Sequence, residues 1–319
     1  MKIIDILKTN AKKPLFSFEI TPPERGGSIE DVFKVVNKLK EFQPAFIGIT
    51  SHASKAVYED QPDGTIKRRT LKERPGTIGV CGVIKWKYGI ESVAHLCCRG
   101  FTRKETEYAL IDLDYLQIQT LFLIRGDEPG YKKPEEELVN DYAAGLVRQV
   151  TDMNRGKYLE KVVNASPKDF CVGVAGYPEK HPEAPNLSYD IKRLKEKVDA
   201  GADYIITQMF FDNKKYFNFL SRCREQDIKV PIIPGIKVLS KPYQLKSIPM
   251  KFFVDIPEEF ETAMAKSSEE KCLEAGVNWA IDQCKELFSK GIPYIHFFVM
   301  KDIEPISKVI KSLVVLKDS

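Results

Sequence analysis

A carboxyl side chain near the start of the chain has the setting of a general acid. Glu19 lies in residues 15–20, an apolar run typical of a buried strand. Burial removes water from a carboxylate and raises its pKa. A carboxyl group tuned in this way stays protonated near neutral pH and can give a proton to a substrate. A structural Glu19 paired with a nearby Lys or Arg is the alternative that the residues leave open.

Other polar groups stand where later apolar runs end. Arg125, Gly126 and Asp127 follow one such run, and Gln208 ends another. The glycine lets a ligand approach the backbone, and the arginine offers a fork of donors for phosphate or an electron-rich ring. A plain salt-bridged turn between Arg125 and Asp127 is the alternative interpretation.

The segment 175–184 is the most informative loop. It contains Tyr177, His181 and two prolines, which together indicate a stiff rim able to hold a large cofactor. Asp190 and Lys197 follow seven residues apart, on one face of the next predicted helix. A single histidine such as His95, in an earlier strand, is more often structural than a ligand.

Strand and helix patterns alternate along the whole chain, which predicts parallel strands joined by helical crossovers. Eight repeats favour a closed (β/α)8 barrel, forming one domain over residues 1–319, with its function at the carboxyl ends of the strands. The predicted strands are 15–20, 45–50, 92–97, 120–125, 170–175, 204–208, 232–235 and 294–299. The predicted helices are 29–42, 72–88, 102–115, 136–154, 189–200, 214–225, 241–248 and 269–290. Residues 1–10 read as a short helix, 55–76 as an insertion, and 249–268 as the place of an extra helix.

Composition excludes several classes of protein. The 319 residues are 43% hydrophobic and 29% charged, with a net charge of +4, as in ordinary globular proteins. The densest basic run, within residues 67–74, is interpreted as a solvated loop, so no nucleic acid is expected as a partner. No apolar run is long enough to span a bilayer and no signal peptide is recognisable, which predicts a cytoplasmic location without membrane association. Seven irregularly spaced cysteines argue against disulfides, with only Cys97 and Cys98 held open, and the four histidines give no metal-binding motif.

Several segments together resemble the 5,10-methylenetetrahydrofolate reductase family. They occur in the family's order and spread over nearly the whole chain: 16–23, 123–127, 175–184, 197–203, 206–211 and 233–236. The resemblance implies a barrel that holds FAD and uses NADH or NADPH to reduce 5,10-methylenetetrahydrofolate to 5-methyltetrahydrofolate by a ping-pong mechanism. It implies a supply of methyl groups for methionine synthesis, and a catalytic barrel without the C-terminal regulatory domain of eukaryotic relatives.

The resemblance also assigns roles to residues. Glu19 is expected to protonate N5 of the folate, and Asp127 to be the catalytic carboxylate near the flavin and the pterin. Asp127, Gln208 and Gln244 are expected to bind the substrate. The positions expected to contact the flavin or the nicotinamide are Thr50, Ala53, His95, Arg125, Gly126, Asp127, Ala143, Tyr177, His181, Ala184, Asp190 and Lys197.

Two other functions stay open beside this one. The first is a flavin-free lyase or aldolase with Glu19 and His95 as acid and base. The second is a folate- or flavin-binding subunit that serves a partner enzyme. Whichever of these functions the chain has, we expect it to form a homo-oligomer.

Overall fold

Eight parallel strands close into a barrel, as the sequence predicts. The computed structural model describes residues 2–9, 14–126, 138–265, 268–300 and 302–315. The strand order around the barrel is β1-β10-β9-β8-β7-β6-β5-β2, with each neighbouring pair parallel. The strands are β1 Leu15–Ile20, β2 Ile47–Ile49, β5 Ser92–Cys97, β6 Thr120–Ile124, β7 Cys171–Gly176, β8 Tyr204–Met209, β9 Ile232–Ile236 and β10 Tyr294–Met300.

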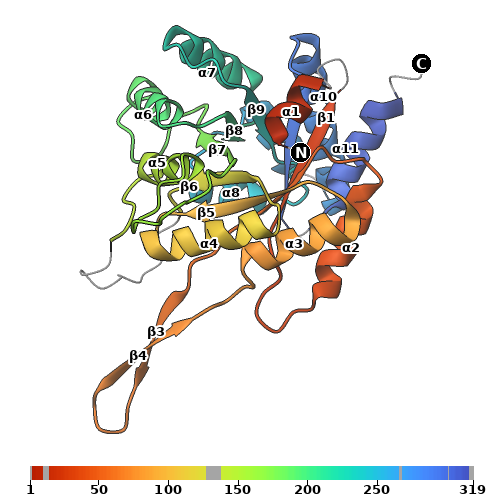
Figure 1. Cartoon of the computed structure of the whole chain (residues 1–319). Helices are drawn as coiled ribbons and strands as arrows, with labels where there is room; N and C mark the ends of the chain where they lie inside the picture. The colour runs from red at the N-terminus through yellow and green to blue at the C-terminus, as the bar shows by residue number, and fades with distance from the viewer. Residues whose placement is uncertain (1, 10–13, 127–137, 266–267, 301, 316–319) are drawn as a thin grey trace.

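Helices surround this barrel and connect its strands (Figure 1). Local sequence signals fix where several of them begin. Ser28 and Asp31 form a reciprocal cap at the start of α2, and the Asp212 side chain caps α7. The helices are α1 Ile3–Thr9, α2 Ile29–Lys40, α3 Thr77–Tyr88, α4 Arg103–Tyr115, α5 Ala143–Asn154, α6 Leu187–Asp199, α7 Asn213–Glu225, α8 Gln244–Phe252, α9 Glu258–Ala265, α10 Glu269–Ser289 and α11 Glu304–Val315. Helix α9 is the extra helix expected within 249–268, whereas α11 was not predicted.

The core has one layer between strands and helices, another inside the barrel, and a smaller cluster that includes residues of α8, α9 and α10. Ile3 and Leu7 of α1 join the interior layer with Phe122 and Tyr204, so α1 packs against the residues that fill the barrel. The hydroxyl of Tyr204 donates to the Leu121 carbonyl at 3.0 Å. Gly173 makes room for this ring, because a Cβ there would lie 2.1 Å from Tyr204 Cζ.

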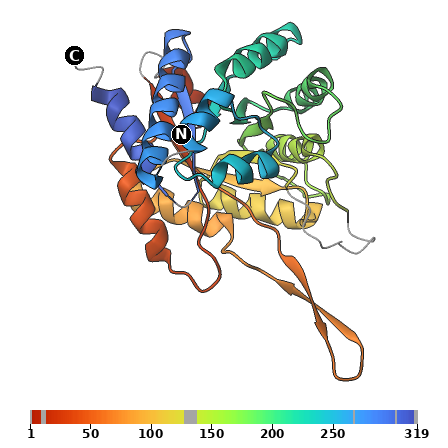
Figure 2. The ribbon, with the colours of Figure 1, turned by 180° about the vertical axis from the view of Figure 1, so that it is seen from behind.

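The insertion forms an antiparallel hairpin, not the solvated loop expected for its basic run. Strands β3 Lys55–Asp60 and β4 Ile66–Leu71 pair over six residues each. Gly64 takes a φ of +81° in the turn between them, a conformation that glycine adopts without strain. Figures 1 and 2 show the hairpin projecting away from the barrel. We call residues 55–71 the arm.

All seven cysteines are free and buried, so the pair held open at Cys97 and Cys98 forms no disulfide. Within the described ranges, none of the helices is both long and apolar enough to cross a membrane.

Candidate active site

Glu19 lies at the carboxyl end of β1, where barrel enzymes place their chemistry. Its side chain is 18% exposed. Burial raises the pKa of Glu19 from 4.5 to about 7, and the positive charge of Lys237 offsets part of this rise. The sequence-based expectation of a desolvated carboxyl group is therefore met, and Glu19 holds a proton over part of the neutral range.

His95 of β5 lies beside Glu19 inside the barrel. Its Nε2 lies 3.9 Å from Glu19 Oε2, too far for a hydrogen bond. Burial lowers the pKa of His95 to about 3, so the ring is neutral at pH 7 and this contact is not an ion pair. Gly48 on β2 makes the room, because a Cβ there would lie 2.9 Å from His95 Nε2.

A second buried histidine lies in the same interior layer. His296 of β10 shares a hydrogen bond of 2.9 Å between its Nδ1 and Ser17 Oγ. Burial lowers its pKa to about 3, with His95 as the second cause. Neither ring can supply positive charge to the carboxyl group of Glu19 at neutral pH.

Lys237 supplies the positive charge near Glu19. It directly follows β9, is only 8% exposed, and donates from Nζ to the Phe298 carbonyl at 2.9 Å. Burial lowers the pKa of Lys237 to about 8, while Asp302 and Glu19 act in the opposite direction. A proton donor and a buried cation that acts on its pKa are therefore both present at the barrel mouth.

Arg125 comes directly after β6 and pairs with a carboxylate from another loop. Its Nη1 donates to Glu183, and Arg99 Nη2 lies 3.8 Å from the same carboxylate. The Arg125 guanidinium also lies 4.8 Å from the centre of the Tyr142 ring. The hydrogen bond from Arg125 lowers the pKa of Glu183. Arg125 Nε is buried and has no hydrogen-bond partner among the described residues.

Hydrogen bonds and a ring contact hold together the loop between β7 and α6, for which the composition predicts a stiff rim. The His181 backbone N–H donates to Asp190 Oδ2 at 2.9 Å, and the rings of His181 and Tyr177 meet edge to face at 4.9 Å. Lys197 Nζ donates to the Ala175 carbonyl at 2.6 Å, and burial lowers the pKa of Lys197 to about 8. The structure thus brings Tyr177, His181, Asp190 and Lys197 into one unit of loop and helix.

The two predicted substrate glutamines are held by local backbone groups. Gln208 Oε1 accepts from the Met209 N–H at 2.9 Å. Gln244 is the first residue of α8, and its Oε1 accepts from the N–H groups of Ser240 at 2.7 Å and Lys241 at 3.0 Å. Each carbonyl is therefore oriented before any ligand binds.

The remaining predicted positions lie at other strand ends and loops. Thr50 Oγ1 shares a 2.9 Å hydrogen bond with His52 Nε2, and Ala53 is half-buried at the base of the arm. Gly126 has a φ of +83°, and Ala184 is buried. Ala143 begins α5 and packs against the outer core. Asp127, predicted to be both catalytic and substrate-binding, lies outside the described residues.

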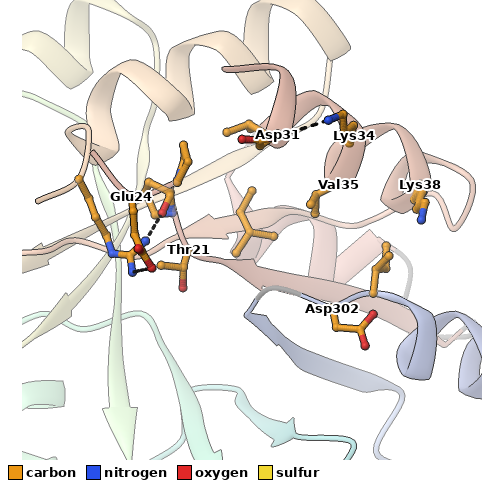
Figure 3. Close-up of a pocket in the computed structure, with 13 residues that line it drawn as sticks. Thr21, Glu24, Asp31, Lys34, Val35, Lys38 and Asp302 are labelled. Carbon is orange, nitrogen blue, oxygen red and sulfur yellow. Dashed lines mark hydrogen bonds and ion pairs between the residues drawn. The ribbon is translucent and has the colours of Figure 1, made fainter. Parts of the chain in front are cut away.

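A cavity of about 440 Å³ opens beside the end of β1 (Figure 3). It lies between the loop after β1, helix α2 and the segment that precedes α11. Its polar lining includes Lys34, Lys38 and Asp302, and Arg74 pairs with Glu24 at 3.3 Å. Among the predicted site residues that the structure describes, none lines this cavity.

Sequence reasoning missed Lys237. The available signal was a lysine directly after the apolar run 232–236. No group of three or more His, Cys, Asp or Glu side chains that could hold a metal ion was found in the described part of the chain. The chemistry that the arrangement supports is proton transfer by Glu19 beside a cation, next to a rim of cationic and aromatic groups.

Comparisons with known proteins identify the family. A family model described as methylenetetrahydrofolate reductase matches residues 2–314. The chain is 33% identical over 293 residues to the 5,10-methylenetetrahydrofolate reductase of Salmonella typhimurium, covering 90% of this chain and 86% of that protein. It is 29% identical over 313 residues to methylenetetrahydrofolate reductase (NADH) 1 of Arabidopsis thaliana, covering 94% of this chain. The chain spans about half of that plant protein, 48% of its length.

A solved structure shares the fold. It is an uncharacterized protein from Clostridium thermocellum that binds two copies of 5-methyl-5,6,7,8-tetrahydrofolic acid. The TM-score is 0.59 at 15% identity, covering 98% of this chain and 99% of that one, which shows a common architecture. Because the family model matches nearly the whole chain, this protein belongs to the methylenetetrahydrofolate reductase family.

Proposed function

We propose that this protein reduces 5,10-methylenetetrahydrofolate to 5-methyltetrahydrofolate, with FAD bound at the barrel mouth and NADH or NADPH as reductant. The proposal rests chiefly on the pKa of Glu19, which is about 7 and lets this residue deliver a proton near neutral pH. Glu19 lies at the carboxyl end of a barrel strand in a chain that belongs to the methylenetetrahydrofolate reductase family. The two substrates would react in turn at the same site, as a ping-pong mechanism requires.

The donors on one side of the barrel mouth fit a flavin dinucleotide. Arg125 carries a buried Nε without a partner among the described residues, and this atom suits an anionic or carbonyl acceptor. Lys197 adds a buried ammonium, and the rings of Tyr177 and His181 add an aromatic rim. We infer that these residues hold the cofactor, which supplies hydride transfer when it is bound.

Glu19 would hold the proton that activates the folate at N5. A pKa of about 7 leaves roughly half of the carboxyl groups protonated at pH 7. Lys237 limits the rise of that pKa, so the acid can both lose a proton during turnover and regain one from solvent. The preset carbonyls of Gln208 and Gln244 would leave the amide NH₂ groups to donate to the pterin.

His95 weighs against a lyase in which it forms an acid–base pair with Glu19. With a pKa of about 3 the imidazole is a weak base, and at neutral pH it has no extra proton to donate. We infer that His95 instead borders the cofactor as a neutral polar group.

The test is to follow the two half-reactions separately under anaerobic conditions. Protein loaded with FAD is mixed with NADH, then with methylenetetrahydrofolate, while flavin absorbance at about 450 nm is recorded. Glu19→Gln should lose absorbance with NADH at the normal rate, but recovery with the folate should slow by about 10²–10⁴-fold. Glu30→Gln, an exposed carboxyl group on α2, is the matched control and should behave as the wild type.

Each alternative has its own outcome. Protein that cannot be loaded with FAD would refute the proposed reaction and favour the lyase. A bound flavin that neither NADH nor NADPH reduces would favour the partner subunit. Normal recovery in Glu19→Gln would leave the reaction standing but remove Glu19 as its acid.

A further inference from the structure

The arm receives little support from the barrel. Among the described strands, β3 and β4 pair only with each other. Two large side chains, Tyr58 and Ile66, are 62% and 65% exposed. An isolated two-stranded hairpin is marginally stable in water. A long open ribbon of this kind therefore gains stability if a further strand covers one of its edges.

The backbone of the arm shows which groups face the open edge of β3. Gln61 donates its N–H inward to the Thr65 carbonyl at 2.8 Å. Backbone groups alternate in direction along an antiparallel strand, so Glu59 and Val57 also turn theirs toward β4. Ala56 and Tyr58 consequently present their N–H and C=O groups on the outer edge.

Charge distinguishes the two edges. β4 contains Lys67, Arg68 and Arg69 in a row, so pairing this strand with itself would bring like charges together. β3 reads Lys-Ala-Val-Tyr-Glu-Asp and is self-complementary. A two-fold axis at Val57 places Val57 opposite Val57 of a second copy, and Lys55 opposite Glu59 of that copy. Ala56 then lies opposite Tyr58, and the outward backbone groups of these two residues pair.

The intramolecular ion pairs of the arm fit the same arrangement. Lys55 Nζ lies 2.8 Å from Glu73 Oε2, and Glu59 pairs with Arg69. Adding the second copy gives a row of alternating charge, Glu73–Lys55–Glu59–Arg69, and the two-fold axis repeats it. Because the contact uses the same edge of both copies, it closes on itself and stops at two.

We propose that two copies of this chain dimerise through the outer edge of β3, forming a four-stranded sheet in the order β4-β3-β3-β4. The proposal uses none of the residues placed in the active site, so it stands or falls independently of the proposed reaction. The contact is short, and we expect a dissociation constant in the micromolar range, about 1–100 μM.

The first test is sedimentation velocity of the 319-residue chain from about 1 to 100 μM. The wild type should shift from monomer to dimer over this range. Ala56→Pro removes an N–H from the open edge without taking one from the β3–β4 ladder, and should weaken dimerisation at least tenfold. Its melting temperature should match that of the wild type. A monomeric wild type, or a dimer that is equally strong in Ala56→Pro, would overturn the proposal.

The second test is disulfide trapping, which also reports the register. The native thiols are all buried, so an introduced surface cysteine is the reactive one. Val57→Cys should cross-link rapidly with a mild oxidant, because opposed residues that are not hydrogen-bonded lie about 4.5 Å apart at Cα. Thr70→Cys on β4 is the matched control, since three strand spacings separate the two copies by about 14 Å or more. Equal cross-linking of both variants would refute the β3 edge, and faster cross-linking of Tyr58→Cys would refute the register.

Discussion

Replacing Glu19 by Gln should stabilise the fold at alkaline pH while it removes the acid. The folded protein raises the pKa of Glu19 from 4.5 to about 7, so the folded state holds this proton more tightly than the unfolded chain does. The resulting stability is fully present below pH 4.5 and is lost as the pH rises through 7. Glutamine resembles the protonated acid, and its contribution does not change over this range.

The magnitude follows from the two pKa values. At about 1.4 kcal/mol per pH unit, the interval from 4.5 to about 7 corresponds to about 3 kcal/mol. This is a ceiling, because the side chain is 18% exposed and solvent screens part of the effect. The advantage of Glu19→Gln over the wild type should therefore grow by about 2 kcal/mol between pH 5 and pH 8.

The assay is urea unfolding of both proteins at pH 5, 6, 7 and 8, followed by circular dichroism. Glu30→Gln serves as the control for a surface carboxyl group and should follow the wild type at each pH. Parallel curves for wild type and Glu19→Gln, or a variant that is less stable at pH 8, would refute the argument that Glu19 is desolvated.

Three further predictions concern the same site and its frame. The rate of flavin reoxidation by the folate should fall about tenfold per pH unit above pH 7, because Glu19 loses its proton there. The rate of flavin reduction by NADH should not show this fall. Stopped-flow rates of reoxidation that stay constant up to about pH 9 would contradict the prediction. Lys237→Met removes the charge that lowers the pKa of Glu19, so the fall in the reoxidation rate should begin at a higher pH. Lys241→Met, which replaces an exposed lysine, should leave the pH dependence unchanged. Gly173→Ala should cost at least ~2 kcal/mol in urea unfolding because its Cβ would meet Tyr204, whereas Gly79→Ala, where the Cβ meets nothing within 4 Å, should be neutral or stabilising.

The barrel could be predicted because buried parallel strands appear in the sequence as short runs of apolar residues. β1 and β5 have the bounds that the sequence indicated, and the other barrel strands differ by one or two residues at one end or at both. Helix α3 begins at Thr77 instead of residue 72, since Pro75 and Gly76 disfavour helix before them. The two strands of the arm were not predicted, because their many charged residues do not give the apolar pattern of a strand. The residues Pro62-Asp63-Gly64 are nevertheless typical of the turn between two strands.

The sequence indicated where the candidate residues lie along the strands, but not which side chains contact one another. The strand-end rule placed Glu19, Arg125 and Gln208 at the mouth of the barrel. The electrostatic interaction of Lys237 with Glu19 joins segments that are remote in sequence, and nothing local encodes it. Nothing local encodes the pairing of Arg125 with Glu183 either, because Glu183 lies in the loop after β7.

The pairing of β1 with β10 makes closure of the barrel wait for a late segment of the chain. Leu15 donates its N–H to the Pro293 carbonyl at 2.8 Å, so the strand that leaves the ribosome first is completed by a strand that leaves near the end. Until β10 is made, β1 and β9 each lack a neighbour on one side. A nascent chain paused before residue 294 therefore carries two open strand edges, which other chains can pair with. Pairing of β10 with β1 and β9 covers both edges at once and closes the barrel.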